Sequence, residues 1–405
     1  MKAIVKKKML PELRFDEFQK EYRILKFNNI VKLRKKKIDP IKSNDSFKSV
    51  ELESIEKETG LLVKTFDSEN LKSLKTKFHK GDILFGKLRP YLRKFYFCEF
   101  EGICTSEIWA FYSNSECNKY VYYLIQTSKF NYQVNITTGT RMPRADWNQI
   151  STTKFRIPSF KEQQKIANFL TAIDQRITLL KEKKAALEDY KKGLMQKIFS
   201  QEVRFKDGEG NDFPDWEENR LVEICDVKGG KRIPKGYSLE NKNNGFPYIT
   251  VSNMLNGTVS LKDIKFVPKE AFPKIKNYRI FTNEIYISVA GTLGLVGVIP
   301  KELNGANLTE NANKLTNIKC NQKYLYHYLN SNYFKKLIWS VRTTNAQPKL
   351  AIYALKSFVV KLPKKQEQQK IANFLSTIDQ NINTMKKQIA DSELFKKGLL
   401  QRMFV

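Results

Sequence analysis

The chain has 405 residues and a formal net charge of +30, which comes from 72 lysines and arginines against 42 aspartates and glutamates. Hydrophobic residues make up 41% of the sequence, which is enough to fill folded cores and excludes a wholly disordered basic tail. The charge favours a polyanionic partner, nucleic acid before a membrane surface, over a surface that is basic only for solubility. No run of about 18 apolar residues predicts a transmembrane helix, and no apolar stretch after the basic N-terminus predicts a signal peptide.

Cysteine and histidine are too few for the sites that they usually build. The five cysteines contain no Cys-x-x-Cys pair, which is typical of a reduced cytoplasmic protein. The two histidines, His79 and His327, exclude a His-rich metal site and are expected to be structural. The sequence has no Walker-type loop, no Asn-Pro-Pro-aromatic tetrad of an amino-methyltransferase and no nuclease triad. We therefore expect a binding protein with no catalytic residue and no metal site.

Residues 1–158 are expected to form a first variable block of α+β structure. β-rich runs at 81–86 and 103–112 precede a helical stretch at 120–132. Basic residues interleaved with aromatics follow the first run, and a polar, basic loop follows the helical stretch. Such side chains contact phosphates and base edges, although an ordinary surface role competes for each single residue. The candidate DNA-binding residues are Lys87, Arg89, Arg93, Lys94, Thr140, Arg141 and Arg144.

Residues 159–200 are expected to form one long helix. Apolar residues recur with alternating steps of four and three residues, the period of a coiled-coil seam, interrupted by Lys184 and Lys191. Ser159 and Glu162 match a capping box, and Gly193 within the pattern suggests close packing or a local bend. At 1.5 Å per residue the helix would be roughly 58 Å long. The predicted seam includes Ile166, Leu170, Ile173, Ile177 and Leu180.

Residues 201–360 are expected to form a second variable block, again of α+β type. β-rich runs at 248–251, 284–290 and 295–300 precede a helical stretch at 324–338. The glycines at 291–297 do not have the spacing of a nucleotide-binding loop and predict a turn between two strands. The candidate DNA-binding residues of this block are Lys231, Arg232, Arg342, Asn345, Gln347 and Lys349.

Residues 361–405 repeat the first helix. Segment 367–404 aligns with segment 162–199 at a constant offset of 205 without a gap, and 22 of the 38 positions are identical. Ser392 and Lys396 interrupt this seam, and Lys364 stands where the capping serine would be. The predicted seam includes Ile371, Leu375, Ile378, Ile382 and Met385. The chain is therefore a tandem duplication of a variable block followed by a helix.

Weak traces of the duplication extend into the variable blocks. Pro143-Arg144 matches Pro348-Lys349 at the same offset of 205, and Asp82-Ile83 loosely resembles Glu284-Ile285. Elsewhere the two blocks have little sequence similarity. This indicates that the repeated helices have the same architectural role in both halves, and that the two blocks recognise different things.

The matching seams predict that the two helices pair within the chain as an antiparallel coiled coil, because amphipathic helices of this length need a partner. The alternative is that each helix packs only on its own block. The expected fold class is α+β, with two α/β recognition domains separated by the paired helices and related by a pseudo-two-fold repeat.

On these features the chain resembles the specificity subunit of a type I restriction–modification system, over essentially its whole length. The resemblance rests on the half-chain duplication and on the two Glu-Gln-Gln-Lys-Ile-Ala motifs, at 162–167 and 367–372, each of which follows a proline. The Lys-Lys-Gly-Leu sequences near the end of each repeat add to it.

The resemblance implies a non-catalytic, cytoplasmic subunit of a phage-defence complex. The blocks would be target recognition domains, each reading one half of a bipartite DNA sequence in the major groove, and the helices would set the gap. The helices would also dock two modification (methyltransferase) subunits, which restriction subunits with translocase and nuclease activity join. This chain would bind no cofactor, since S-adenosylmethionine, ATP and Mg are expected on the partners. Because the blocks diverged, we expect an asymmetric target. The alternative is a basic coiled-coil adaptor without sequence-specific DNA binding.

Overall fold

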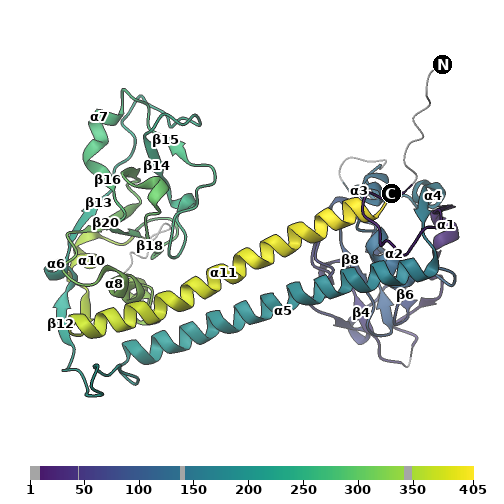
Figure 1. The fold of residues 1–405 in the computed structure, drawn as a ribbon, viewed down its shortest axis with the longest axis horizontal. Coiled ribbons are helices and arrows are strands. Elements are labelled where there is room, and N and C mark those ends of the chain that lie inside the picture. The colour runs from purple at the N-terminus through teal and green to yellow at the C-terminus, as the bar shows by residue number, and fades with distance from the viewer. Residues whose placement is uncertain (1–9, 44, 137–141, 342–348) are drawn as a thin grey trace. The chain divides into compact units, whose positions relative to one another are not determined.

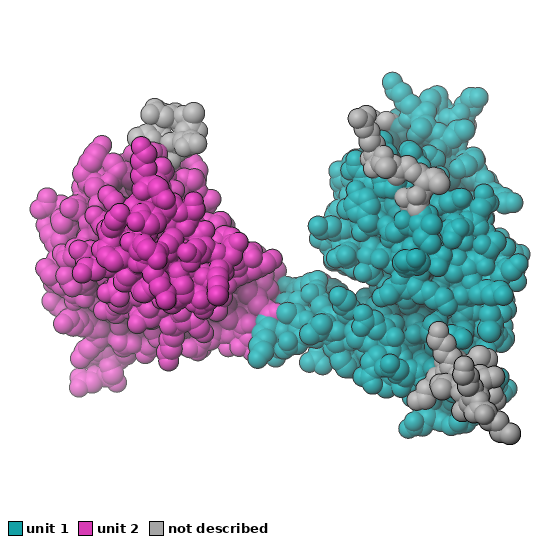
Figure 2. All heavy atoms as spheres, turned by 90° about the horizontal axis from the view of Figure 1, so that it is seen from above, with its two compact units in different colours: residues 1–181, 387–405 teal, residues 182–386 magenta. Residues whose placement is uncertain are grey.

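The computed structural model describes residues 10–43, 45–136, 142–341 and 349–405. The chain divides into two compact units (Figure 2). Unit 1 comprises the residues up to Lys181 together with Lys387–Val405, and unit 2 comprises Glu182–Lys386. These boundaries differ from those expected at 158, 200 and 360, because each variable block shares its core with parts of both long helices. In the described ranges no helix combines the length and the hydropathy that a membrane span needs.

The two long helices are α5, Phe160–Phe199, and α11, Lys365–Met403. Both are drawn as uninterrupted ribbons in Figure 1. The 40 and 39 residues of these helices agree with the expected helical repeats.

Unit 1 contains three sheets and short helices between them. Its strands are β1 (Arg23–Lys26), β2 (Lys32–Leu33), β3 (Lys37–Ile38), β4 (Lys48–Val50), β5 (Phe66–Asp67), β6 (Lys75–Phe78), β7 (Ile83–Gly86), β8 (Phe95–Phe97), β9 (Gly102–Cys104), β10 (Ile108–Tyr112) and β11 (Lys154–Ile157). Its short helices are α1 (Phe27–Ile30), α2 (Asn118–Leu124), α3 (Ser128–Val134) and α4 (Trp147–Thr152).

Unit 2 is built in the same way. Its strands are β12 (Glu217–Arg220), β13 (Asp226–Gly229), β14 (Pro247–Ile249), β15 (Lys265–Phe266), β16 (Arg279–Ile280), β17 (Ile285–Ser288), β18 (Val296–Val298), β19 (Ala306–Leu308), β20 (Ala312–Thr316) and β21 (Val359–Leu362). Its short helices are α6 (Leu221–Ile224), α7 (Phe272–Ile275), α8 (Gln322–Leu329), α9 (Asn332–Val341) and α10 (Ile352–Ser357).

The two units share their strand order although their sequences diverged. The order β2-β10-β7-β8 in unit 1 corresponds to β13-β20-β17-β18 in unit 2. The second sheets correspond as β6-β9-β4-β5 and β16-β19-β14-β15, with a parallel pair at the centre of each, and unit 1 adds β3 at one edge. A two-stranded sheet, β1-β11 or β12-β21, completes each unit. The α+β class and the internal duplication are confirmed.

Short breaks divide several of the predicted elements. The stretch 120–132 is two helices, because Thr127 accepts a hydrogen bond from Phe130 N and caps α3. Ser331 accepts one from Phe334 N at the start of α9, which divides the stretch 324–338 in the same way. The glycine segment 291–297 contains the predicted turn between the antiparallel strands β17 and β18, and its last glycine, Gly297, lies in β18.

Each unit has one large core that includes residues of α5 and of α11. In unit 1, Ile166 and Leu170 of α5 and Leu399 and Met403 of α11 are buried with an aromatic cluster around Phe27. In unit 2, Ile198 of α5 and Ile371 and Leu375 of α11 are buried with Tyr324 and Tyr328. Helix ends and variable block therefore share one hydrophobic core.

The helices run antiparallel in each unit. In unit 1, Lys396 contacts Asp174 and Glu393 contacts Lys181, so residue numbers fall along α11 as they rise along α5. In unit 2, Lys191 contacts Asp379 and Glu188 contacts Lys386 in the same sense. The predicted seam residues are buried or half-buried: Ile166, Leu170, Ile177, Ile371, Leu375, Ile378 and Ile382 are buried, and Ile173, Leu180 and Met385 are half-buried.

Two local expectations for the helices are wrong. Glu162 N donates to Ser159 Oγ, but the Glu162 carboxylate faces Arg14 and Tyr22 instead of returning to the cap, so the capping box is only half formed. Of the two roles expected for Gly193 and Gly398, close packing is excluded, because a Cβ atom at either position would meet nothing within 4 Å, and a local bend stays a prediction.

Candidate nucleic-acid interface

The Glu-Gln-Gln-Lys motif at the start of each long helix anchors that helix to its variable block. Glu162 is fully buried and accepts hydrogen bonds from Arg14 Nε at 2.8 Å and from Tyr22 Oη at 3.0 Å. Glu367 is equally buried and accepts from Arg204 Nη2 at 2.8 Å and from Trp216 Nε1 at 3.2 Å. A buried carboxylate that lost these partners would be costly, so the pairs hold the helix start in place.

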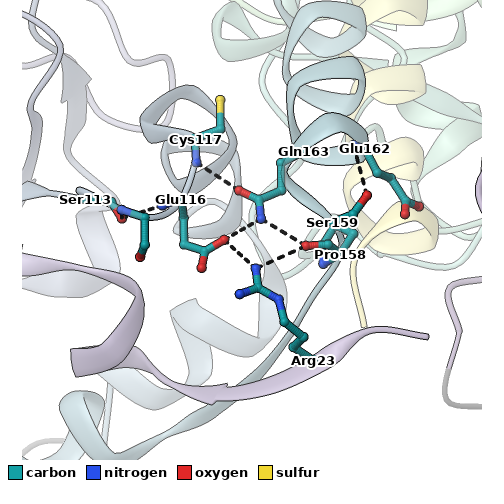
Figure 3. A network of polar contacts seen from close by, with 9 residues as sticks. Arg23, Ser113, Glu116, Cys117, Pro158, Ser159, Glu162 and Gln163 are labelled. Atoms are coloured by element: carbon teal, nitrogen blue, oxygen red, sulfur yellow. Dashed lines mark hydrogen bonds and ion pairs between the residues drawn. The ribbon is translucent and has the colours of Figure 1, made fainter. Parts of the chain in front are cut away.

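The glutamine that follows connects the strand before the helix to a second, short helix (Figure 3). Gln163 Nε2 donates to Pro158 O at 3.0 Å, and its Oε1 accepts from Cys117 N at the start of α2, at 2.9 Å. The same side chain donates to Glu116, which Arg23 contacts at 2.7 Å.

Gln368 reproduces this arrangement in unit 2. Its Nε2 donates to Pro363 O at 2.8 Å, and its Oε1 accepts from Asn321 N at the start of α8, at 2.8 Å. The two motifs therefore have an architectural role in the described structure, and the candidate contacts to DNA lie elsewhere.

In unit 1 the basic segment around Tyr91 forms a tight turn. A 3-10 turn at Pro90–Leu92 is flanked by Arg89 and Arg93, whose φ angles of 52° and 49° are in the left-handed region. This conformation costs roughly 1–2 kcal/mol for a residue with a Cβ, so the surrounding contacts must hold it. Tyr91 is exposed at the tip of the turn, and the exposed Arg89 begins it.

Two of the predicted DNA contacts in this segment are bound to the protein itself. Arg93 Nη2 donates to Gln126 O at 2.7 Å, and Lys94 Nζ donates to Leu52 O at 2.6 Å. Burial lowers the pKa of Lys94. Both side chains fix the turn to the body of unit 1.

The structure brings the segment at 87–94 beside the segment that leads into α4. Arg89 N donates to Pro143 O and Ala145 N donates to Lys87 O, both at 2.8 Å, and Leu88 and Arg144 form an isolated β-bridge. The exposed Arg144 contacts Glu107 Oε2 at 3.0 Å, and this hydrogen bond raises the pKa of Arg144. Thr140 and Arg141 lie outside the described residues.

In unit 2 the predicted residues Lys231 and Arg232 lie near the C-terminal end of β19, a central strand of its sheet. Lys231 N donates to Leu308 O at 2.8 Å, and Arg232 Nε contacts Glu310 Oε1 at 2.5 Å. The carbonyl of the adjacent Asn311 accepts from Val289 N at 2.8 Å. Lys231 and Arg232 are exposed. Arg342, Asn345 and Gln347 lie outside the described residues.

Arg144 and Lys349 occupy equivalent places in the two units. Lys349 forms an isolated bridge with Ala290, as Arg144 does with Leu88. The next residue, Leu350, donates its N–H to Val289 O at 3.0 Å, as Ala145 does to Lys87. The same backbone frame therefore carries a basic side chain at one surface position in each unit, before α4 and before α10.

Sequence reasoning missed the acidic partners Glu107 and Glu310. They lie 37 and 78 residues from Arg144 and Arg232, and no local pattern connects them. Each accepts a hydrogen bond from an exposed arginine and so orients its guanidinium.

The two histidines are in ordinary structural surroundings. His327 Nε2 lies 3.2 Å from Ser376 Oγ, and burial lowers the pKa of His327 to about 3. His79 Nδ1 lies 3.1 Å from Glu101 Oε1. Among the described residues no group of three His, Cys, Asp or Glu side chains has the arrangement of a metal site.

Comparison with known proteins agrees with the duplication. The family model described as "Type I restriction modification DNA specificity domain" matches twice, over residues 19–189 and 214–392. The MjaVIII specificity subunit of Methanocaldococcus jannaschii is 26% identical over 292 residues, which cover 69% of this chain and 68% of that protein. The MjaIX specificity subunit of the same organism is 23% identical over 299 residues, 71% of this chain and 68% of that one.

Solved structures show the same fold at lower identity. A chain from work on assembly and conformational transition of the type I R-M system has a TM-score of 0.59 and 20% identity, covering 96% of this chain and 97% of that one. The S subunit from M. genitalium has a TM-score of 0.58 and 17% identity, covering 98% and 99%. With two matches of the family model, one in each half, the chain belongs to the family of type I restriction–modification DNA specificity proteins.

Proposed function

We propose that this chain, as the specificity subunit of a type I restriction–modification complex, reads a bipartite, asymmetric DNA sequence, one half with each unit. One observation carries the proposal: two units with the same strand order present basic side chains at equivalent surface positions, Arg144 and Lys349, on loops of different sequence. A shared frame gives both units the same approach to duplex DNA, and different loops give them different base preferences.

The half-site preferences differ because the surface side chains differ. Unit 1 presents Arg89 and Tyr91 beside Arg144, whereas unit 2 has glycine at 291 and presents Lys231 and Arg232. Each good bidentate contact to a base is worth about 1–3 kcal/mol, so one unit alone discriminates only a few base pairs. Two units that bind one duplex together add their discrimination.

The paired helices act as the spacer that sets the gap between the half-sites. The antiparallel pairing of α5 with α11 in both units supports this role. In the proposed complex two modification subunits dock on the helices, and restriction subunits join them. S-adenosylmethionine, ATP and Mg belong to those partners in the cytoplasm, and this chain contributes sequence choice without catalysis.

Sequencing of methylated bases in the host genome tests the proposal. One bipartite, gapped, asymmetric adenine-methylation motif is expected, and it disappears when the gene is deleted and returns with a plasmid copy. A motif that persists without the gene would refute the assignment.

A binding measurement separates the proposal from a basic adaptor protein. The chain in complex with its modification subunit is titrated with a duplex that carries the motif and with a scrambled duplex, at several salt concentrations. A steep loss of affinity with salt together with preference for the motif is expected. Binding without preference for either duplex would favour the adaptor.

A further inference from the structure

One lysine in each unit lies inside the apolar seam between α5 and α11. Lys396 Nζ in unit 1 lies 2.7 Å from Asp174 Oδ1, and Lys191 Nζ in unit 2 lies 2.6 Å from Asp379 Oδ1. Each lysine side chain is only 14% exposed. Lysines and aspartates are both related by the offset of 205, so the chain contains the same pair twice; these are named the seam pairs.

The aspartate of each seam pair lies beside a short helix of its own variable block. In unit 1, Tyr123 of α2 donates its hydroxyl to Asp174 Oδ2 at 2.9 Å, and the Lys396 ammonium lies 5.5 Å from the centre of the Tyr123 ring. In unit 2 the equivalent residue of α8 is His327, whose Nδ1 lies 3.9 Å from Asp379 Oδ2. In unit 1 a hydrogen bond therefore ties the seam pair to α2 of the block, whereas in unit 2 Asp379 lies beside α8 and His327 Nδ1 makes no hydrogen bond to any described residue.

A second ion pair in each unit lies at the edge of the seam. Lys181 contacts Glu393 at 2.7 Å in unit 1, and Lys386 contacts Glu188 at 3.9 Å in unit 2. All four side chains are between 40% and 54% exposed. Exposed pairs of this kind contribute little to stability or specificity, which makes them a matched control for the seam pairs.

An apolar seam by itself specifies the register of two helices poorly. Leucine and isoleucine recur with the same period along both helices, so a shift by one heptad brings one aliphatic side chain to the place of another. A buried lysine does not tolerate that shift, because its ammonium would face aliphatic groups while the aspartate lost its partner.

We propose that the seam pairs Lys396–Asp174 and Lys191–Asp379 determine the register of α5 against α11 and, through it, the length of the DNA gap. The inference rests on the proposed function, in which the helices set the distance between the half-sites. The seam pairs act as positioning residues, and the exposed ion pairs do not.

The register is tested first without DNA, in the full chain. The test variant carries Lys396→Met, Asp174→Leu, Lys191→Met and Asp379→Leu. The control variant makes the same kind of change in the exposed pairs: Lys181→Met, Glu393→Leu, Lys386→Met and Glu188→Leu. Buried ion pairs replaced by apolar residues of similar size often leave stability unchanged or raised, so the test variant is expected to fold. Spin labels are placed at the exposed Gln175 and Lys397 of unit 1, with Cys117→Ala and Cys320→Ala as background.

Pulsed electron resonance then measures the distance between the two labels. One distance is expected in the parent and in the control variant. In the test variant we expect a second population at a longer distance, because a slip by one heptad, about 10 Å along the helix axis, moves apart two labels that start opposite each other. A single, unchanged distance in the test variant would overturn the proposal. If the test variant does not fold, a variant with both pairs exchanged is measured instead: Asp174→Lys with Lys396→Asp, and Asp379→Lys with Lys191→Asp. This variant should keep the parental distance, whereas Lys396→Asp alone should not.

The methylation pattern tests the consequence for DNA. In cells with the test variant, the fraction of methylated sites with a non-parental gap is expected to rise about tenfold, with both half-sites unchanged. An unchanged gap distribution would overturn the link between the seam pairs and the gap. If the parent chain directs no bipartite motif, the proposed function fails, whereas the distance measurement still decides the register.

Discussion

Units 1 and 2 have the same backbone frame but differ in the side chains that complete it. The buried glutamate at the start of each long helix accepts from an arginine in both, yet its second donor is Tyr22 in unit 1 and Trp216 in unit 2. Beside the seam aspartate stands Tyr123 in one unit and His327 in the other. The repeated motif therefore fixes the contacts between the main elements, and the blocks vary around these contacts.

The strongest way to test this equivalence is to break the glutamate anchor in each unit in turn. Glu162→Ala or Glu367→Ala leaves a half-buried arginine and the buried Tyr22 or Trp216 without their acceptor, which is expected to cost about 3 kcal/mol in the affected unit. Hydrogen exchange with mass spectrometry, which follows each unit separately, measures the loss. Glu17→Ala removes an exposed ion pair with Lys165 and should cost about 1 kcal/mol or less. Equal losses for Glu17→Ala and Glu162→Ala would contradict the anchoring role.

A smaller effect distinguishes the two half-sites. Arg144→Ala is expected to reduce discrimination at one half-site by about 1–3 kcal/mol, and Lys349→Ala at the other half-site only. Competition binding of the complex with duplexes substituted in one half-site at a time measures both. Lys183→Ala, on an exposed face of α5, is the control and should leave both half-sites unchanged. An equal loss at both half-sites from one substitution would indicate phosphate contact without base reading.

Acid is expected to lower the stability of unit 2 through His327. Burial, with Lys191 and Lys323 nearby, lowers its pKa to about 3, whereas the unfolded side chain titrates near 6.5. The unfolded state therefore binds the proton first, and the free energy of unfolding of unit 2 should fall as pH drops from 6.5 towards 3, by about 2 kcal/mol at pH 5.

The His327→Tyr variant, which copies unit 1, should lose this part of the acid sensitivity, and Tyr123→His should introduce it into unit 1. Unfolding by denaturant at pH 7.5 and pH 5, followed by hydrogen exchange in each unit, is the measurement. Identical acid sensitivity in the parent and in His327→Tyr would exclude His327 as its source.

The smallest expected effect is a gain. Gly193→Ala and Gly398→Ala place a Cβ in open space within a helix, and each should raise the stability of its unit by about 1 kcal/mol. Gly102→Ala is the opposite case, because its Cβ would lie 2.5 Å from Lys48 O, and it should destabilise unit 1. Thermal unfolding of the three variants compares them, and a loss of stability at Gly193 would show that the helix needs the glycine.

The sequence was sufficient for the long helices and the duplication, because a seam with a period of 3.5 residues is visible within each repeat. It also matched Arg144 with Lys349, and both form the same isolated bridge. The sequence was insufficient to predict a contact where the partner of a side chain lies far away along the chain. Lys191 read as an interruption of the seam, and its partner Asp379 lies 188 residues away.

Arg93 and Lys94 illustrate the same limit for the candidate interface. The segment around them has a composition typical of DNA binding. Their side chains, however, donate to the carbonyl oxygens of Gln126 and Leu52, which lie 33 and 42 residues away along the chain. Only the folded chain shows which basic side chains of a cluster are used to hold the cluster in place.

The division of each long helix between two cores has a consequence for synthesis. Unit 2 is one continuous stretch, Glu182–Lys386, whereas unit 1 needs Lys387–Val405 to complete its core. Tyr120 stacks on Phe404 with ring centres 5.1 Å apart, so its partner is translated only after the whole of unit 2. At about 5–20 residues per second, the start of unit 1 waits some tens of seconds for that segment. The first part of unit 1 is therefore expected to expose an incomplete core while unit 2 is being translated, and chaperones would have to cover it.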